Sequence, residues 1–260
     1  MSIEQTETLH NASFKTINDE SVIEINNLRI GFDNQEVIKN VSLKLFNGEN
    51  LVVLGKSGSG KSVLIKCIVR LLNPDEGTIK VFGENVRELS MEGLGELRKK
   101  IGFLFQSGAL YDSMSVKQNL EFPLRRIKRN LTQKEIDEKV KEVLENVGLS
   151  DSIDRMPSQL SGGMRKRISL ARTIIVDPMI MLYDEPTTGL DPVTSDEISS
   201  LINDVQKKYK TSSIIITHDI ECSRATANRI IMLQDGEVYM EGKLEEFEKS
   251  TVPSIKSFFK

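Results

Sequence analysis

Short apolar runs alternate with longer polar segments along most of the chain, and this pattern predicts a parallel β-sheet. Runs of four or five mostly apolar residues, typical of strands buried on both faces, occur at residues 51–54, 101–105, 179–183, 213–216 and 229–233. Helical crossovers connect such strands in α/β folds. The sequence therefore predicts an α/β fold with a parallel sheet flanked by helices.

Two segments ahead of the first buried strand predict an N-terminal antiparallel β subdomain. Residues 22–30 mix apolar and polar positions in partial alternation, and residues 37–46 alternate apolar with polar positions. Asn47-Gly48 follows as a hairpin turn that leads into residues 51–54. Residues 77–83 predict a further short strand and residues 90–100 a charged helix, while Asp235-Gly236 predicts a hairpin into residues 237–240.

A charged segment from residue 107 to about residue 175 predicts a helical insertion. Thr132-Gln-Lys-Glu135 has the form of a capping box, which opens an amphipathic helix. The apolar residues that follow at helical spacing are Ile136, Val140, Val143, Leu144 and Val147. The insertion divides a main domain that we assign to residues 21–248.

Both ends of the chain differ from this domain. Residues 1–20 are polar and predict a flexible N-terminal extension. Residues 249–260 predict an amphipathic tail, with Val252, Ile255, Phe258 and Phe259 on one helical face. This tail can close the core of its own chain or dock on a partner, and the sequence favours neither.

The first candidate site is a glycine-rich loop between a buried strand and an apolar helix predicted to run to about Leu72. Residues 55–62 match G-x-x-x-x-G-K-S, the P-loop, whose backbone N–H groups surround phosphate oxygens at a helix N-terminus. Lys61 would reach the β- and γ-phosphates and Ser62 would ligate Mg²⁺. The predicted nucleotide-binding residues are Gly55, Lys56, Ser57, Gly58, Ser59, Gly60, Lys61, Ser62 and Val63.

Two acids end the strand at residues 179–183. Asp184 and Glu185 lie at the carboxyl end of a parallel strand, where α/β sheets bind ligands. Asp184 would hold Mg²⁺ opposite Ser62, and Glu185 would be the general base that polarises the attacking water.

A third candidate feature is Leu160-Ser-Gly-Gly163, which predicts a second anion-binding helix end. Ser161 can cap the helix, and Gly162 and Gly163 leave its N-terminus open to an anion. Because this helix end cannot easily face the triphosphate on the P-loop of its own chain, the pattern favours two chains arranged head to tail.

Composition narrows the class of protein. The chain has 260 residues, with 38% hydrophobic and 28% charged residues, and a net charge of −3, so no overall basic field attracts nucleic acid. No run reaches the ~18–20 apolar residues of a membrane-spanning helix, and the N-terminus has no apolar stretch of signal-peptide length. We therefore expect a cytoplasmic protein whose contact with membranes comes through a partner.

Taken together, these motifs resemble the ATP-binding cassette (ABC) ATPases over about residues 22–243. The resemblance implies that Gln106 senses Mg²⁺ and water and also ligates the metal, that Asp191 crosses a dimer interface, and that His218 lies at the γ-phosphate. It implies that Phe32 stacks on adenine, with Ile30 as the alternative residue. The implied cofactors are ATP and Mg²⁺, and the implied partners are a second copy of the ATPase and an integral membrane permease.

Within the family, Met164 and residues 105–124 resemble the ATPase subunit of Mla-type phospholipid transporters. This implies an MCE-type lipid-binding partner, an accessory subunit and a peripheral location on the inner face of the cell membrane. The alternatives are another small-molecule ABC importer or exporter, a non-transport ABC ATPase acting on DNA or ribosomes, and a nucleotide-binding regulator without turnover.

For each of two further segments, the sequence allows two interpretations. Leu110, Tyr111 and Met114 lie where the family docks the permease's coupling helix, but they can equally pack between subdomains. Residues 125–129 form a basic run that suits either a solvated helix face or acidic lipid headgroups.

Overall fold

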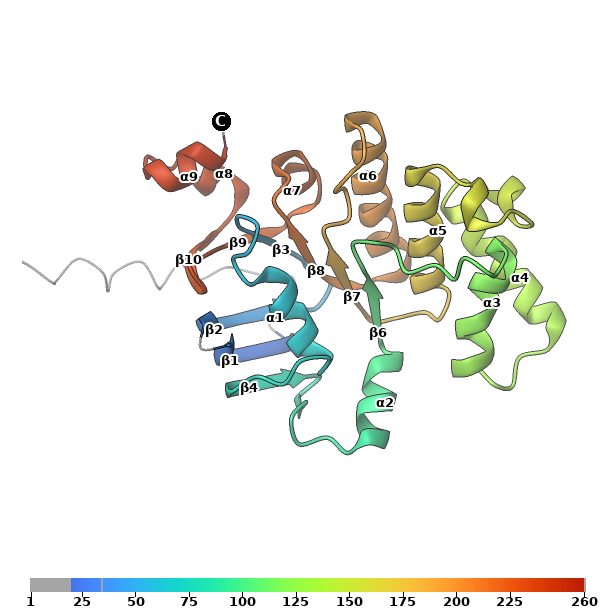
Figure 1. Ribbon diagram of the computed structural model, residues 1–260, viewed down its shortest axis with the longest axis horizontal. Helices are drawn as coiled ribbons and strands as arrows, with labels where there is room; N and C mark the ends of the chain where they lie inside the picture. The colour runs from blue at the N-terminus through green and yellow to red at the C-terminus, as the bar shows by residue number, and fades with distance from the viewer. Residues whose placement is uncertain (1–19, 34, 260) are drawn as a thin grey trace, which may run out of the picture.

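The computed structural model describes residues 20–33 and 35–259, and within them one ten-stranded sheet organises the fold (Figure 1). The predicted N-terminal extension, apart from Glu20, lies outside the described residues. The strand order is β5-β4-β1-β2-β10-β9-β3-β8-β7-β6. The strands are β1 (Ser21–Phe32), β2 (Gln35–Phe46), β3 (Asn50–Leu54), β4 (Glu76–Val81), β5 (Glu84–Asn85), β6 (Ile101–Leu104), β7 (Ile180–Asp184), β8 (Ser212–Thr217), β9 (Arg229–Gln234) and β10 (Glu237–Gly242).

The sheet has an antiparallel part and a parallel part, as the sequence predicts. β1 pairs antiparallel with β2 and β4, whereas β3 lies parallel between β9 and β8, and β7 lies parallel between β8 and β6. β10 joins the two parts because it pairs with β9 and contacts β2 at one position. The predicted fold class, a P-loop core with an N-terminal antiparallel β subdomain, is confirmed.

Helices cover both faces of the parallel strands. They are α1 (Lys61–Ile68), α2 (Met91–Lys99), α3 (Val116–Ile127), α4 (Gln133–Asn146), α5 (Gly162–Ile174), α6 (Pro192–Tyr209), α7 (Ile220–Thr226), α8 (Leu244–Glu248) and α9 (Pro253–Phe258), with short 3₁₀ turns at Ser150–Ser152 and Pro157–Gln159. No helix among these described residues combines the length and apolar character needed to cross a bilayer.

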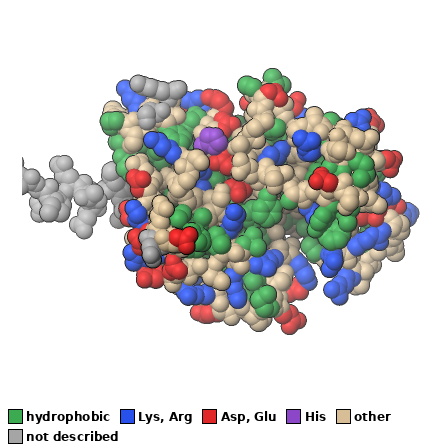
Figure 2. Space-filling view, viewed as in Figure 1, with side chains coloured by type: hydrophobic (Ala, Val, Ile, Leu, Met, Phe, Trp, Pro, Cys, Tyr) green, Lys and Arg blue, Asp and Glu red, His purple; other side chains and the backbone are tan. Residues whose placement is uncertain are grey.

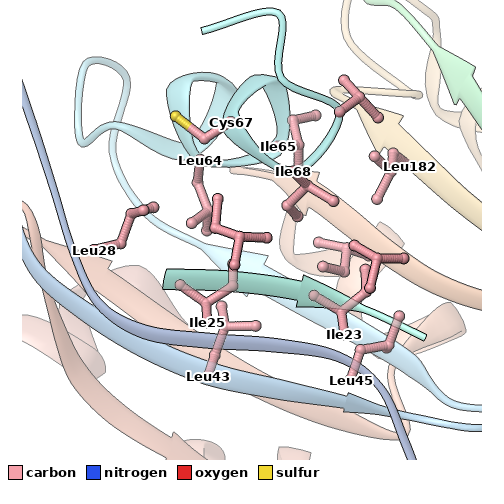
Figure 3. Close-up of a cluster of buried hydrophobic side chains, with 14 of the residues drawn as sticks. Ile23, Ile25, Leu28, Leu43, Leu45, Leu64, Ile65, Cys67, Ile68 and Leu182 are labelled. Atoms are coloured by element: carbon pink, nitrogen blue, oxygen red, sulfur yellow. The ribbon is translucent and has the colours of Figure 1, made fainter. Parts of the chain in front are cut away.

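Two buried clusters lie on opposite faces of the sheet. On one face, α1 packs with β1 and β2 against Leu182, Ile214 and Ile216 (Figure 3). On the other face, α5, α6 and α7 pack against Met181, Tyr183 and Ile215. Alternate residues of β7 and β8 therefore serve different clusters, as the side-chain alternation of a strand requires.

The helical insertion extends from one end of the sheet (Figure 1) and consists of α3, α4, the 3₁₀ turns and α5. The predicted capping box is present at the start of α4. The Thr132 hydroxyl accepts a hydrogen bond from the Glu135 N–H, and the Glu135 carboxylate accepts one from the Thr132 N–H at 2.7 Å. Local capping thus fixes where this helix begins.

Two predictions from the sequence are wrong, one of a hairpin and one of a helix end. Asn47-Gly48 forms a turn but no hairpin, because β2 and β3 are separated in the sheet by β10 and β9. The helix after the P-loop ends at Ile68 rather than near Leu72. Arg70, two residues past this end, has a φ of 51°, outside the helical region, and the Arg98 side chain donates to the carbonyls of Val69 and Arg70 at 2.9 and 3.1 Å.

The C-terminal tail packs on its own chain, and the predicted helical face is wrong at one position. Ile255 is buried, and the Phe259 ring lies 5.9 Å from that of Phe247. Phe258 also contacts this cluster. Val252 is 38% exposed because it precedes α9 instead of lying on its packed face.

We expect Ile255→Ala to lower the free energy of unfolding by about 2–5 kcal/mol, because it leaves a cavity in the buried cluster. Val252→Ala, which truncates an exposed apolar side chain of the same tail, should change it by less than about 0.5 kcal/mol. Urea denaturation followed by circular dichroism measures both variants. Equal effects of the two substitutions would contradict the packing of the tail.

A buried arginine fastens the antiparallel part of the sheet to the parallel part. Arg229 on β9 is 4% exposed, and its Nε and Nη2 donate to the two carboxylate oxygens of Glu49 at 2.7 and 2.8 Å. It also donates to the Lys44 carbonyl at 2.6 Å and pairs with Glu241. These bonds cross from β9 to the end of β2 and to β10, so they hold three strands together.

Arg229→Ala should lower the free energy of unfolding by about 3–5 kcal/mol, because it leaves the buried Glu49 carboxylate unpaired. The control is Arg224→Ala, which removes ion pairs with Glu221 and Glu248 at the surface and should cost less than about 1 kcal/mol. Chemical denaturation of both variants gives the comparison. A loss below about 1 kcal/mol for Arg229→Ala would contradict a fastening role.

Candidate functional site

The P-loop connects β3 to α1 in a conformation that depends on glycine. Gly60, the residue that precedes α1, has a φ of 95°. A Cβ at Gly60 would lie 3.0 Å from the Val37 carbonyl oxygen, so a larger residue would be crowded as well as strained by the positive φ. Since Gly60 has no side chain to cap the helix, the N–H groups of the first turn remain available to an anion.

Lys61 lies within this loop, almost completely buried. Its Nζ donates to the carbonyls of Gly55 and Lys56 at 2.8 and 3.0 Å, and it lies 3.6 Å from Glu185 Oε1. Burial lowers the pKa of Lys61, although the carboxylates of Glu185 and Asp184 oppose this shift. The loop therefore concentrates positive charge beside the acids that end β7.

Ser62 and Asp184 supply the oxygen donors for a metal ion. The Ser62 hydroxyl donates to Asp184 Oδ1 at 2.7 Å, and Asp184 is 5% exposed. A hydroxyl and a carboxylate suit Mg²⁺, which takes hard oxygen ligands and is bound through few protein groups together with phosphates and waters. At a P-loop, the phosphates of the nucleotide would supply further oxygen ligands to this metal.

Glu185 is held in a fixed orientation beside the P-loop. It is 8% exposed and has a φ of 50°, unusual for a residue other than glycine. Its Oε2 lies 2.8 Å from His218 Nδ1 and accepts a hydrogen bond from the Thr188 hydroxyl at 3.1 Å. The predicted general base and the predicted γ-phosphate histidine are thus direct neighbours, and His218 itself is largely exposed.

The contact of Gln106 with the neighbouring site residues is made by its backbone carbonyl. Its side chain is exposed, and its carbonyl accepts a hydrogen bond from Lys166 Nζ at 2.6 Å. Among the hydrogen bonds of the described residues, none joins Gln106 to Ser62 or to Asp184. Its role as a metal ligand remains a prediction.

The structure distinguishes the two candidates for adenine stacking. Phe32 ends β1 and is 43% exposed, whereas Ile30 is 3% exposed within the core. Phe32 therefore has a ring face available to a base, and Ile30 does not. The stacking itself remains a prediction.

The second predicted anion-binding helix end, at Ser161, Gly162 and Gly163, lies next to Asp191, the predicted dimer-interface residue. Ser161 is exposed and caps α5 by accepting from the Met164 N–H at 3.3 Å, with Gly162 and Gly163 in the first turn. A Cβ at Gly163 would lie 2.5 Å from Cγ2 of Thr194. Thr194 in turn donates to Asp191 through its hydroxyl, at 2.6 Å, and through its N–H.

Asp191 is exposed and caps α6, and the hydrogen bonds from Thr194 lower its pKa. A carboxylate that is already ionised and oriented at the surface is available to a second chain. Its crossing of a dimer interface remains a prediction.

The two helix ends that could bind anions lie on opposite faces of the sheet. α1 belongs to the cluster with Leu182, Ile214 and Ile216, whereas α5 belongs to the cluster with Met181, Tyr183 and Ile215. Figure 1 shows the same separation, with α1 beside β1 and β2 and α5 beside α3 and α6. This arrangement agrees with the expectation that the α5 end serves a nucleotide on another chain.

One buried residue at the site is absent from the sequence-based candidates. Lys166 on α5 is 7% exposed, and its Nζ lies 3.4 Å from the Glu185 carbonyl oxygen as well as at the Gln106 carbonyl. Helical spacing could have identified it. Lys166 lies four residues before Leu170 and eight before Ile174, both of which are buried, so it falls on the apolar face of α5.

The sequence and the fold are similar to those of known proteins. A family described as ABC transporter matches residues 38–188. The probable ribonucleotide transport ATP-binding protein mkl of Mycobacterium tuberculosis is 39% identical over 91% of this chain. The chloroplastic protein trigalactosyldiacylglycerol 3 of Arabidopsis thaliana is 38% identical over 93% of this chain and 74% of its own length.

The chain spans 66% of the length of the mycobacterial relative. A solved dimeric structure of the ATP-binding cassette MJ0796, in a post-hydrolysis state bound to ADP and Pi, is 32% identical with a TM-score of 0.78. That alignment covers 85% of this chain and 98% of the cassette. The chain therefore belongs to the ABC transporter family, as an ABC ATPase domain of the class that binds ATP with Mg²⁺.

Proposed function

We propose that this chain is the ATP-hydrolysing subunit of an ABC transporter and that two copies enclose Mg-ATP between them. The observation that carries this proposal is the group formed by Ser62, Asp184 and Glu185 beside Lys61. The Ser62 hydroxyl and Asp184 are 2.7 Å apart, and Glu185 lies 3.6 Å from Lys61 and 2.8 Å from His218. These are the groups needed to hold a triphosphate and to activate a water molecule.

Each side chain has a distinct task in this mechanism. Lys61 and the N–H groups of α1 bind the β- and γ-phosphates, while Ser62 and Asp184 hold the metal. Bound Mg²⁺ neutralises charge on the phosphate oxygens. Glu185 acts as the general base that polarises the attacking water, and His218, which contacts its carboxylate, orients it and contacts the γ-phosphate.

A second chain completes each site in the proposed arrangement. The α5 end with Ser161, Gly162 and Gly163 is exposed on the face of the sheet opposite α1, so it is free to meet the nucleotide of a partner. The dimeric cassette with 32% identity supports this proposal. ATP would hold the two copies together, and hydrolysis would let them part.

We propose a phospholipid as the transported substrate. Residues 105–124 and Met164 resemble the Mla-type branch, and one relative carries the name of a glycerolipid, trigalactosyldiacylglycerol. The proposed partners are an integral permease, an MCE-type lipid-binding protein and an accessory subunit, with the ATPase on the cytoplasmic side of the membrane. Nucleic acid is not a proposed partner.

The second candidate is an ATPase subunit of another small-molecule ABC transporter. It is favoured by the mycobacterial relative, whose name refers to ribonucleotide transport. This candidate shares the whole nucleotide site and differs only in the permease and its substrate.

A pull-down of the tagged chain from detergent-solubilised membranes of its own cells tests the proposal, with ATPase activity measured on the eluate. The proposal expects a permease, an MCE-type protein and bound phospholipid. The Glu185→Gln chain as bait is the matched control, because it should capture the same partners without the ATPase activity. Recovery of a different permease with no lipid would favour the second candidate, and recovery of ribosomes or DNA-bound proteins would contradict a transport function.

A further inference from the structure

Helix α5 holds the segment after β6 along one of its faces. Lys166 donates to the Gln106 carbonyl at 2.6 Å, and Arg172 donates to the Ala109 carbonyl at 2.7 Å. Between them, a Cβ at Gly108 would lie 2.6 Å from the Ser169 hydroxyl oxygen, so the loop backbone packs directly on the helix. The three α5 residues are spaced three apart and share a face of the helix. Residues 106–109 are therefore bound to α5 at successive points.

Lys166 extends this contact to the acids that end β7. Its side chain is buried, and its Nζ also lies 3.4 Å from the Glu185 carbonyl oxygen. Burial lowers the pKa of Lys166, while Asp184 and Glu185 favour its charged form. A buried ammonium group is costly unless it is hydrogen-bonded, and here its partners are the backbone carbonyls of two predicted site residues.

The Glu185 backbone needs such support. Its φ of 50° falls in the left-handed region, which strains a residue with a side chain. Its N–H donates to the Ile216 carbonyl at 2.9 Å, and its carbonyl accepts from the Thr188 N–H at 3.3 Å and from Lys166 Nζ at 3.4 Å. Both backbone polar groups of Glu185 are therefore hydrogen-bonded. β8 binds the N–H, while the local turn at Thr188 and Lys166 of α5 share the carbonyl.

We propose that Lys166 is a positioning residue that couples the N-terminal end of α5 to Gln106 and Glu185. Ser161, at that end, lies on the same helix only five positions before Lys166. This inference rests on the proposed function, in which Ser161 meets the nucleotide of the partner chain. A displacement of α5 on nucleotide capture would shift the carbonyls of Gln106 and Glu185, so one site would sense whether the other is closed.

Lys166→Met in the full chain tests this coupling, because it keeps an unbranched side chain, one heavy atom shorter, and removes the charge and the donors. We expect kcat to fall at least about tenfold, since small displacements of catalytic groups cost rate steeply. The affinity for Mg-ATP, measured by nucleotide titration, should stay within about threefold of the unsubstituted chain, because Lys61 and Ser62 are untouched. Lys166→Arg, which keeps donors at this place, should retain more of the activity.

The control variant is Lys134→Met, which removes a lysine with an 87% exposed side chain on α4 and should leave kcat and the melting temperature unchanged. The melting temperature of Lys166→Met is recorded in parallel, because loss of the ammonium group removes a hydrogen-bond donor from two backbone carbonyls and can lower the stability of the fold. If it does fall, the folded Lys166→Arg variant is decisive. A partial recovery of kcat supports positioning, and a loss as complete as that of Lys166→Met contradicts it.

An active chain whose Lys166→Met variant has normal kcat would overturn this inference and leave the proposed function intact. A chain that binds no Mg-ATP and hydrolyses none would overturn the proposed function, and the inference with it.

Discussion

Glu185→Gln should slow ATP turnover by about 10²–10⁴-fold, the usual contribution of a general base. Glutamine has nearly the same shape as glutamate and can still accept a hydrogen bond from Thr188, but it cannot take a proton from water. Because Lys61, Ser62 and Asp184 are unchanged, binding of Mg-ATP should remain within about threefold. A steady-state phosphate-release assay together with nucleotide titration measures both quantities.

The matched control for this substitution is Glu138→Gln on α4. The Glu138 side chain is 66% exposed, and no role in the site is predicted for it. It should hydrolyse ATP at the rate of the unsubstituted chain. Turnover by Glu185→Gln within about threefold of that rate would remove Glu185 from its proposed role, and the base would have to be sought elsewhere.

Lys61→Ala should weaken Mg-ATP binding by about 10–100-fold and reduce the rate as well. The lysine is buried in the loop and contributes charged hydrogen bonds to the phosphates, each worth about 1.5–3 kcal/mol. Alanine leaves the backbone N–H groups of α1 in place, so some affinity should persist. Isothermal titration with a non-hydrolysable ATP analogue gives the affinity directly.

Lys66→Ala is the control for Lys61→Ala, since Lys66 lies on the same helix but in its last turn, away from the loop. It should bind the analogue normally. If Lys61→Ala bound the analogue as tightly as Lys66→Ala, the P-loop would not be the site of the triphosphate.

Much of the fold follows from local sequence. The strands at residues 51–54, 179–183 and 213–216 are continuous apolar runs, and each corresponds to a central strand of the parallel sheet. The caps predicted at Thr132 and Ser161 also begin helices in the structure. Such signals act within a few residues, so they can be found without knowledge of the rest of the molecule.

The features that sequence did not predict depend on contacts between distant segments. β2 does not pair with β3 because β10, almost two hundred residues later in the chain, takes the position beside β2. The turn just past α1 is hydrogen-bonded to Arg98, which lies 28 residues beyond Arg70. No local pattern contains either contact.

The candidate site divides in the same way. Motif spacing and the meeting of parallel strands at one edge bring Ser62, Asp184 and Glu185 together, as predicted. Sequence could not predict the hydrogen bond from Thr188 to Glu185. It also could not predict that Thr194 binds Asp191 and lies against Gly163. These contacts depend on how side chains are oriented in the folded chain, which motif spacing does not specify. Lys166 was overlooked because a lysine in a basic stretch, Arg165-Lys-Arg167, resembles a solvated helix face.

In the proposed assembly, which we claim forms during turnover, two copies of this chain close around Mg-ATP, with α5 of each facing the P-loop of the other. The most direct test is the molar mass of Glu185→Gln in solution, measured by light scattering with and without Mg-ATP. We predict a single chain of 29.3 kDa without nucleotide and twice that mass with Mg-ATP. A variant that binds Mg-ATP and keeps the mass of a single chain at every protein concentration would contradict the claim.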